Sequence, residues 1–261
     1  MQVKVALAQV SHPADGNVIG LVERTAEQAA KQGVKLLCFP EGLMAPWDPA
    51  LGCYAVPPEP LYGPYCKKID EAAATNGLWL LYYLNEARPD GNPYNTAVLT
   101  GPDGARRLAY RKTHLFDVGD IRESHRLSAG DAPSAPVKTP FATIGIATCY
   151  ELRFPEIARQ LALAGCDLLI YPAAWVAGPH KADQWETLLK ARAIENEAFV
   201  LGVCRPDSGC IGNSRVVAPD GTVLAAAGSG EELLACDLDM DQVATIRSNV
   251  PVFVHRRPEL Y

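Results

Sequence analysis

The sequence lacks a surplus of positive charge and lacks an uninterrupted apolar run long enough to cross a bilayer. Its 261 residues include 24 Lys and Arg against 30 Asp and Glu, a formal net charge of -6. This balance argues against a nucleic-acid-binding protein and against attraction to an anionic membrane surface. The longest apolar stretch, residues 161–178, is interrupted by Asp167 and Pro172. We therefore expect no partner of either class and no transmembrane helix.

The start of the chain also lacks the pattern of an export signal. Residues 3–9 alternate as a strand does, without a charged segment, an apolar segment and a small-residue cleavage site in succession. We therefore expect a cytoplasmic protein. The eight cysteines form no C-x-x-C pair and have no histidines at zinc-ligand spacing. We expect no metal site, and we interpret seven of the eight cysteines as small core residues.

Several fingerprints of cofactor-dependent and hydrolytic enzymes are missing as well. The sequence has no glycine-rich dinucleotide or P-loop motif, no His-Glu-x-x-His and no Gly-x-Ser-x-Gly. We expect no cofactor.

Two stretches of the sequence recur at similar positions in its two halves. Residues 33–40, GVKLLCFP, are echoed by residues 165–172, GCDLLIYP, and residues 95–104, NTAVLTGPDG, by residues 213–221, NSRVVAPDG. Each half predicts strand–helix alternation followed by a hairpin. Two copies that each bury one sheet face predict a four-layer αββα sandwich with an internal pseudo-duplication. Two separate α/β domains are the alternative, but no linker supports them, so we predict one domain over residues 1–261.

The predicted elements have the same order in both halves. Glycines at positions 33, 77 and 165 are expected to end helices, and the Asp-Gly pairs at 103–104 and 220–221 to form hairpin turns. The predicted strands are 3–9, 34–39, 78–84, 142–148, 167–171 and 198–204, and the predicted helices are 17–32, 64–76, 154–164 and 181–196.

Three reactive side chains follow predicted strands. Glu41 follows the strand that ends near Phe39, Lys112 follows the hairpin strand 107–111, and Cys149 closes the strand 142–148. Ligands of open α/β sheets bind beyond the strand ends, so we expect these groups to meet. A carboxylate, an ammonium and a thiol together suit attack on a carbonyl, with the carboxylate as proton acceptor and the ammonium stabilising both thiolate and oxyanion.

Each residue also has a structural interpretation. Glu41 could be a loop acid, Lys112 a solvated charge and Cys149 a buried structural thiol. A Cys-His protease is a further alternative, with His114 as its candidate base. We favour a hydrogen-bonded structural role for His114.

The sequence around these residues resembles a known family. Phe39-Pro-Glu41, residues 110–117 (YRKTHLFD) and residues 149–156 (CYELRFPE) resemble the three signature segments of the nitrilase superfamily, the carbon–nitrogen hydrolases. Four further segments are similar to its amidase branch: residues 171–175, 191–196, 212–217 and 251–261. The resemblance covers nearly the whole chain and implies the αββα sandwich.

The resemblance implies a catalytic role for several positions. Glu41 is expected to act as general base and then general acid, and Cys149 as the nucleophile that forms a thioester. Lys112 and the backbone N–H of Tyr150 are expected to hold the oxyanion. Glu123, in a Glu-Ser segment that leads to Gly130, is expected to position Lys112 and the substrate.

The implied reaction is hydrolysis of a small linear carboxamide to a carboxylate and ammonia. The short loop 117–122 is similar to bacterial amidases that act on deaminated glutathione, and we favour such an amide. Omega-amidase action on 2-oxo dicarboxylate monoamides, hydrolysis of N-carbamoyl amino acids, and a catalytically silent binding protein are the alternatives.

Other residues are candidates for the pocket and for subunit contacts. Tyr150 and Trp175 are expected to wall the pocket, and Arg122 and Arg153 to receive a substrate carboxylate, as His125, Arg126 and Lys181 also could. For Arg153 we favour a salt bridge with Glu156, and we expect a structural pair between Arg192 and Glu195. The resemblance implies a homodimer or larger homo-oligomer, with the extended tail at about 248–261 in the contact.

Overall fold

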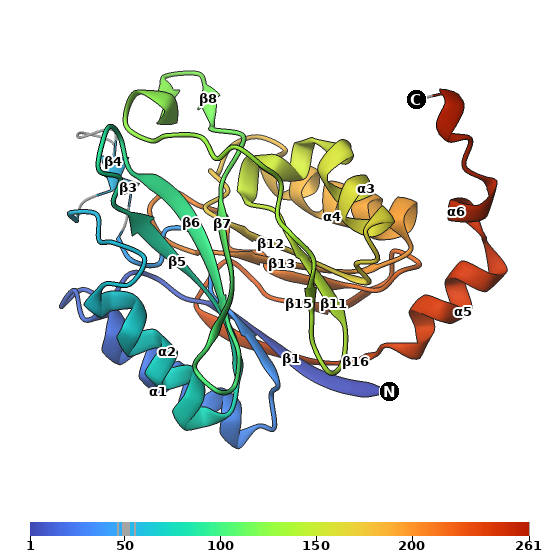
Figure 1. Ribbon diagram of the computed structural model, residues 1–261, viewed down its shortest axis with the longest axis horizontal. Coiled ribbons are helices and arrows are strands. Elements are labelled where there is room, and N and C mark those ends of the chain that lie inside the picture. Colours follow the sequence, from blue (N-terminus) through green and yellow to red (C-terminus); the bar gives the residue numbers. More distant parts are fainter. Residues whose placement is uncertain (46, 49–52, 55, 261) are drawn as a thin grey trace.

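Two six-stranded sheets lie face to face with a pair of helices on each outer side (Figure 1). This computed structural model describes residues 1–45, 47–48, 53–54 and 56–260; of residues 47, 48, 53 and 54 it describes the backbone. The arrangement is the predicted αββα sandwich. Among the described residues, no helix combines the length and hydrophobicity needed to span a bilayer.

The first sheet has the strand order β16-β1-β2-β5-β6-β7, and helices α1 (Val18–Lys31) and α2 (Pro64–Asn76) cover its outer face. Strands β1, β2 and β5 are parallel, whereas β16, β6 and β7 pair antiparallel with their neighbours. The strands are β1 (Gln2–Gln9), β2 (Leu36–Cys38), β5 (Trp79–Glu86), β6 (Tyr94–Thr100), β7 (Arg106–Arg111) and β16 (Glu232–Asp239).

The second sheet repeats this plan in the order β10-β11-β12-β13-β14-β15, under helices α3 (Pro155–Leu163) and α4 (Lys181–Asn196). Three parallel strands again lead into an antiparallel hairpin. The predicted duplication is therefore present in the topology. The strands are β10 (Val137–Lys138), β11 (Thr143–Ile146), β12 (Leu168–Ala173), β13 (Phe199–Cys204), β14 (Arg215–Val217) and β15 (Val223–Ala226).

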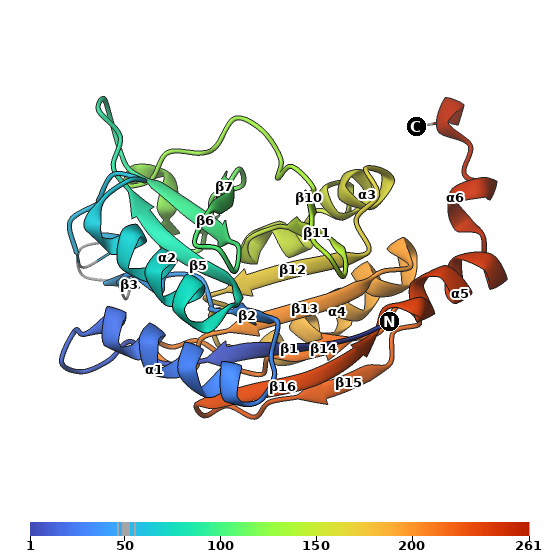
Figure 2. The ribbon, with the colours of Figure 1, turned by 60° about the horizontal axis from the view of Figure 1, so that its bottom comes forward.

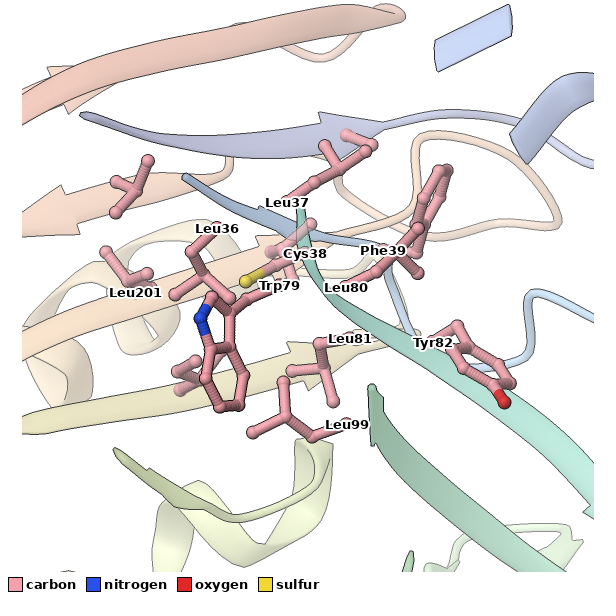
Figure 3. Close-up of a cluster of buried hydrophobic side chains, with 14 of the residues drawn as sticks. Leu36, Leu37, Cys38, Phe39, Trp79, Leu80, Leu81, Tyr82, Leu99 and Leu201 are labelled. Atoms are coloured by element: carbon pink, nitrogen blue, oxygen red, sulfur yellow. The ribbon is translucent and has the colours of Figure 1, made fainter. Parts of the chain in front are cut away.

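Burial on both faces explains why the central strands are continuous apolar runs. In β12, Leu168 and Ile170 join the core between the sheets, whereas Leu169 and Tyr171 pack under α3 and α4. Figure 3 shows Leu201 of β13 in the same cluster as Leu36 and Cys38 of the first sheet. Successive side chains point to opposite faces, so a strand of this kind supplies both cores.

Glycine at three helix ends confirms the predicted boundaries. Gly33, Gly77 and Gly165 have φ angles of 77°, 62° and 93° and follow α1, α2 and α3. This left-handed region is open to glycine at little cost, which allows the chain to turn directly into the next strand.

Several short elements escape the sequence patterns. Strand β10 (Val137–Lys138), which pairs with β11, is not among the predicted strands. A strand of two residues is too short to show a hydrophobic periodicity, so only its pairing with a neighbouring strand defines it. The remaining short elements are β3 (Trp47–Asp48) with β4 (Cys53–Tyr54), β8 (Asp117–Val118) with β9 (Ile121–Arg122), and the 3-10 turns Glu123–His125, Cys149–Arg153 and Pro258–Leu260.

The C-terminal tail is helical rather than extended, which corrects our expectation. It follows α5 (Asp241–Asn249), contains α6 (Val252–His255) and the 3-10 turn Pro258–Leu260, and projects from the body of the molecule (Figures 1 and 2). Val254 in α6 is 80% exposed. Tyr261, the last residue of the predicted contact segment, lies outside the described residues.

The cysteines also differ from expectation. Five are buried, but Cys210 and Cys236 are partly exposed, so the interpretation of seven core cysteines is wrong for these two. The side chain of Cys53 lies outside the described residues.

Candidate active site

The three predicted reactive residues converge at the strand ends. Lys112 follows β7 of the first sheet, and its Nζ lies 2.9 Å from Oε1 of Glu41, which follows β2. Cys149 follows β11 of the second sheet, and its buried thiol is close enough to Glu41 for the carboxylate to raise the pKa of the thiol. Glu41 and Cys149 line one pocket, and the Lys112 ammonium lies beneath it with a fully buried side chain. The site therefore lies between the two sheets.

The Glu41 carboxylate is held by both halves of the molecule. Asn95 Nδ2 in β6 donates to Oε1 at 2.7 Å, and the backbone N–H of Ala174, after β12, donates to Oε2 at 2.9 Å. Sequence reasoning missed both partners. The internal echo that begins at Asn95 was the available signal for the first, whereas a backbone donor such as Ala174 has no side-chain signature.

Glu123 lies on the opposite side of the lysine. Its Oε2 is 2.9 Å from Lys112 Nζ and accepts the backbone N–H of Phe116 at 2.7 Å. The β8–β9 hairpin brings Glu123 back onto this N–H, and the side chain is buried. Lys112 thus lies between two carboxylates.

The two carboxylates differ in proton affinity. Burial alone raises the pKa of Glu41, but the charge of Lys112 and the hydrogen bonds from Lys112, Ala174 and Cys149 outweigh it and hold the pKa below the ordinary value. Burial is the largest effect on Glu123 and raises its pKa; with the smaller repulsion from Glu41 it outweighs the lowering by Lys112 and by the N–H of Phe116. Glu41 is therefore the carboxylate that stays ionised, as a proton acceptor must.

Cys149 opens a tight turn and keeps its proton. Its φ angle of 49° is rare for a residue with a Cβ and is held by the 3-10 turn that begins at this residue. Burial raises the pKa of the Cys149 thiol well above its ordinary value, and Glu41 raises it further, while Lys112 offsets only part. We expected the ammonium to favour a thiolate. Burial and the Glu41 charge instead favour the neutral thiol beside an ionised Glu41.

The pocket at Cys149 has both aromatic and cationic side chains in its wall. Trp175 lies under Arg153 at 4.8 Å and Lys181 at 5.8 Å from the ring centroid, and Tyr150 packs edge-on against Phe116 at 5.2 Å. Among the described residues, the lining is Glu41, Phe116, Ile121, Glu123, Cys149, Tyr150, Arg153, Ala174, Trp175, Val176, Lys181, Arg205, Ser208 and Cys210.

Two predicted cation contacts are not as expected. Arg153 donates to Oε1 of Gln184 at 2.8 Å, and the described ion pairs include none between Arg153 and Glu156, so the favoured salt bridge is wrong. Arg122 lies outside the pocket lining, with its guanidinium bonded to the carbonyls of Gly119 and Ile121. His125 and Arg126 are also absent from the lining.

Two structural predictions are confirmed. Arg192 is buried, lies 2.9 Å from Glu195 and donates to the Leu152 carbonyl at 2.7 Å. His114 lies within hydrogen-bonding distance of Thr113 Oγ1 at 2.9 Å and stacks on Phe154, in a pocket separate from that of Cys149. This placement argues against a Cys-His pair.

Arg205 is a further buried cation that sequence reasoning missed. It forms a bidentate ion pair with Asp207 and donates to the carbonyl of Gly42, the residue after Glu41, at 3.1 Å. It therefore ties the end of β13 to the turn that carries Glu41. Within the described ranges, no group of His, Cys, Asp and Glu is arranged to hold a metal ion.

Known proteins share this sequence and fold. Human omega-amidase NIT2 is 37% identical over 248 residues, which are 90% of this chain and 87% of that protein. Human deaminated glutathione amidase is 37% identical over 252 residues, 90% of this chain and 76% of that protein. A solved structure of the amidase from Nesterenkonia sp. AN1, with acrylamide added at the active-site cysteine, has a TM-score of 0.80 and 26% identity, over 95% of this chain and 98% of that one.

The family match covers most of the chain. Residues 4–248 match the carbon–nitrogen hydrolase family. This range includes the buried acid, lysine and cysteine described above. The chain therefore belongs to the carbon–nitrogen hydrolases of the nitrilase superfamily.

Proposed function

We propose that this chain is an amidase that hydrolyses a small linear carboxamide through a cysteine thioester. One observation carries the proposal: the Glu41 carboxylate lines the same pocket as the Cys149 thiol, whose pKa it raises, and lies 2.9 Å from the Lys112 ammonium. A base, a nucleophile and a cation gathered at one site are what acyl transfer from a neutral amide requires. Family membership already identifies the chain as a hydrolase of carbon–nitrogen bonds other than peptide bonds.

The first half-reaction acylates the enzyme. As Sγ of Cys149 attacks the amide carbon, Glu41 accepts the thiol proton, and the carbonyl electron pair moves onto oxygen. Lys112 and the Tyr150 N–H stabilise that oxyanion. When the intermediate collapses, Glu41 returns the proton to the departing nitrogen, and the C–N bond breaks to release ammonia and leave a thioester.

The second half-reaction regenerates the thiol. Glu41 accepts a proton from water as the water oxygen attacks the thioester carbon. The C–S bond then breaks, the acid is released and the proton returns to sulfur. Glu123 is proposed to fix Lys112, since both of its oxygens lie within 3.2 Å of Nζ.

The pocket wall supports an acidic amide as the substrate. Arg153 and Lys181 lie over Trp175 and have no Asp or Glu partner among the described ion pairs. A carboxylate of the substrate can occupy this position, with Tyr150 on the opposite wall. We favour an amide like deaminated glutathione. A 2-oxo dicarboxylate monoamide is the second candidate, because an omega-amidase is equally similar to this chain.

The test is ammonia release from a panel of amides by the purified protein. It should include deaminated glutathione, a 2-oxo dicarboxylate monoamide, an N-carbamoyl amino acid and a neutral amide. Mass spectrometry of quenched reactions should detect the acyl group on Cys149. Carbon dioxide release would identify carbamoyl hydrolysis. Labelling of Cys149 by iodoacetamide that substrate blocks, without turnover of any amide, would indicate a binding protein.

We further propose a homodimer or larger homo-oligomer in the cytoplasm. The projecting tail supports self-association, because Val254 of α6 and Leu260 of the last 3-10 turn are exposed apolar residues. Light scattering of the full chain should give at least twice the monomer mass of 28.1 kDa. A monomer at micromolar concentration would contradict this proposal.

A further inference from the structure

Glu151 is a buried carboxylate that the reaction sequence does not use. It lies two residues after Cys149 in the 3-10 turn, and its side chain is fully buried. A charged group at such a depth is costly unless its oxygens are fully hydrogen-bonded. The donors that satisfy Glu151 come from two different segments of the chain.

One oxygen holds the segment around Lys112. Oε1 accepts the hydroxyl of Tyr110 at 2.7 Å, the backbone N–H of Thr113 at 2.8 Å and the Thr113 hydroxyl at 2.7 Å. The N–H of His114 lies farther away at 3.2 Å. These donors stand on both sides of Lys112 in the sequence, so they define the path of the backbone that carries it.

The other oxygen holds the turn of Cys149. Oε2 accepts the backbone N–H of Thr148 at 2.6 Å, immediately before the nucleophile. This bond is one half of the capping box of the 3-10 turn; in the other half, the Thr148 side chain accepts the backbone N–H of Glu151. The capping box therefore explains the hydrogen bond to Oε2 of Glu151. It does not explain the hydrogen bonds to Oε1, whose donors come from a distant part of the chain.

The two segments belong to different sheets. Lys112 extends β7 of the first sheet, and Cys149 follows β11 of the second. Among the described ion pairs, only His114 approaches Glu151, at 3.7 Å, so N–H and O–H dipoles rather than Lys or Arg hold its charge. A second bond across the sheets, between Tyr83 and Thr148 hydroxyls at 2.6 Å, holds the same turn.

We infer that Glu151 is a positioning residue that sets the separation of the Lys112 ammonium from the Cys149 thiol and the Tyr150 N–H. The inference rests on the proposed function, in which these groups share one oxyanion. Rigid placement of both donors matters most in the transition state, where a misplacement of about 1 Å costs roughly 100-fold in rate. Loss of Glu151 should therefore lower kcat and leave KM nearly unchanged.

Glu151→Gln tests this with little change in shape. Its amide oxygen can keep the donors near Lys112, but its NH2 group then faces the Thr148 N–H, donor against donor. We expect kcat per titrated thiol to fall about 10- to 100-fold with KM within threefold. The rate constant for alkylation of Cys149 by iodoacetamide should fall too. This readout is independent of amide turnover, so inactivity of the parent would refute the proposed function and leave the inference testable.

Asp70→Asn is the matched control. Asp70 is also a largely buried carboxylate that accepts from a tyrosine, Tyr82, at 3.0 Å and from a threonine, Thr100, at 2.7 Å. It lies in α2 on the outer face of the first sheet, away from the pocket lining. Asp70→Asn should lower the melting temperature but leave kcat per titrated thiol and the alkylation rate constant at parental values.

Two milder variants decide the matter if Glu151→Gln does not fold. Tyr110→Phe and Thr113→Val each remove one hydroxyl donor to Oε1, and each should lower kcat per titrated thiol several-fold at constant KM. The inference is overturned if Glu151→Gln retains kcat and alkylation within twofold of the parent. If only Tyr110→Phe and Thr113→Val fold, the inference is overturned when both retain kcat and the alkylation rate constant within twofold of the parent.

Discussion

The two halves of the molecule have the same scaffold but carry different residues at their strand ends. In the first half, Glu41 follows β2 and Lys112 follows β7, whereas Ala174 and Ala227 occupy the corresponding regions after β12 and β15. The proposed nucleophile Cys149 follows β11, and the counterpart strand β1 ends at Gln9. The first half therefore supplies the Glu41 carboxylate and the Lys112 ammonium, and the second supplies the thiol. The internal duplication explains the layered scaffold. The acid, lysine and cysteine, however, follow β2, β7 and β11 and are not repeated after the counterpart strands β12, β15 and β1.

The echoed asparagines illustrate the same difference. Asn95 donates its side chain to Glu41 at 2.7 Å. Asn213 instead has a φ angle of 56°, and its backbone carbonyl accepts the Trp185 indole N–H at 2.9 Å. One member of the pair serves the proposed base and the other serves packing under α4. Similar sequence therefore predicts similar backbone, not similar chemistry.

The largest effect should come from removing the thiol of the second half. Cys149→Ala should abolish amide hydrolysis, because it removes the thiol that forms the proposed thioester. Ammonia release at saturating amide is the measurement. Cys166→Ala, in which a buried cysteine at the end of α3 is truncated, should retain kcat. Substantial turnover by Cys149→Ala would refute the thioester mechanism.

Removing the cation of the first half should come next. Lys112→Ala should lower kcat by roughly 100- to 1,000-fold through loss of an oxyanion donor. It also leaves Glu41 and Glu123 without their shared ammonium, so circular dichroism must establish the folded fraction. Lys190→Ala, on the surface of α4, is the control with unchanged kcat. A decrease of less than tenfold would show that Lys112 is not an essential oxyanion donor.

The third prediction concerns pH. The folded pKa of Glu41 is lowered, so its ionised form persists, and its stabilising effect is lost only as the pH falls through that value. The acid limb of kcat/KM should therefore lie below the ordinary glutamate pKa of about 4.3. In Glu41→Gln, alkylation of Cys149 should need alkaline pH, since burial raises the pKa of that thiol. An acid limb above about pH 6 would contradict the assignment of Glu41 as the ionised base.

The smallest effects should separate the two asparagines. Asn95→Ala should lower kcat about tenfold, because it removes one hydrogen bond to a charged group. Asn213→Ala should leave kcat unchanged and cost about 1 kcal/mol of stability, since alanine is disfavoured in the left-handed region. Melting curves should show a decrease of roughly 2–4 °C for Asn213→Ala. Equal effects of both variants on kcat would remove the distinction between the halves.

Much of the fold was predictable because its signals are local. The helices predicted at 64–76 and 181–196 have those boundaries in the structure, and glycines ended three helices as expected. The wrong predictions concern very short elements, the C-terminal tail and the choice of a hydrogen-bonding partner. Strand β10 has only two residues, the tail is helical, and Arg153 bonds Gln184 instead of Glu156. When a side chain can reach several partners, the distances in the folded protein decide which of them it bonds. The spacing of residues along the sequence does not give those distances.

By itself, the sequence determined the layered scaffold, because the apolar periodicity of strands and helices is a local pattern. It also determined the identity of the acid, lysine and cysteine, because each lies in one of three ordered motifs. Only the tertiary structure decided how those groups are charged and held. The neutral thiol of Cys149, the lowered pKa of Glu41 and the bonds from Asn95, Ala174 and Glu151 all depend on burial between two sheets. A side chain becomes buried, and a hydrogen-bond donor comes to point at it, only when distant segments of the chain meet. No single segment of the sequence therefore encodes either property.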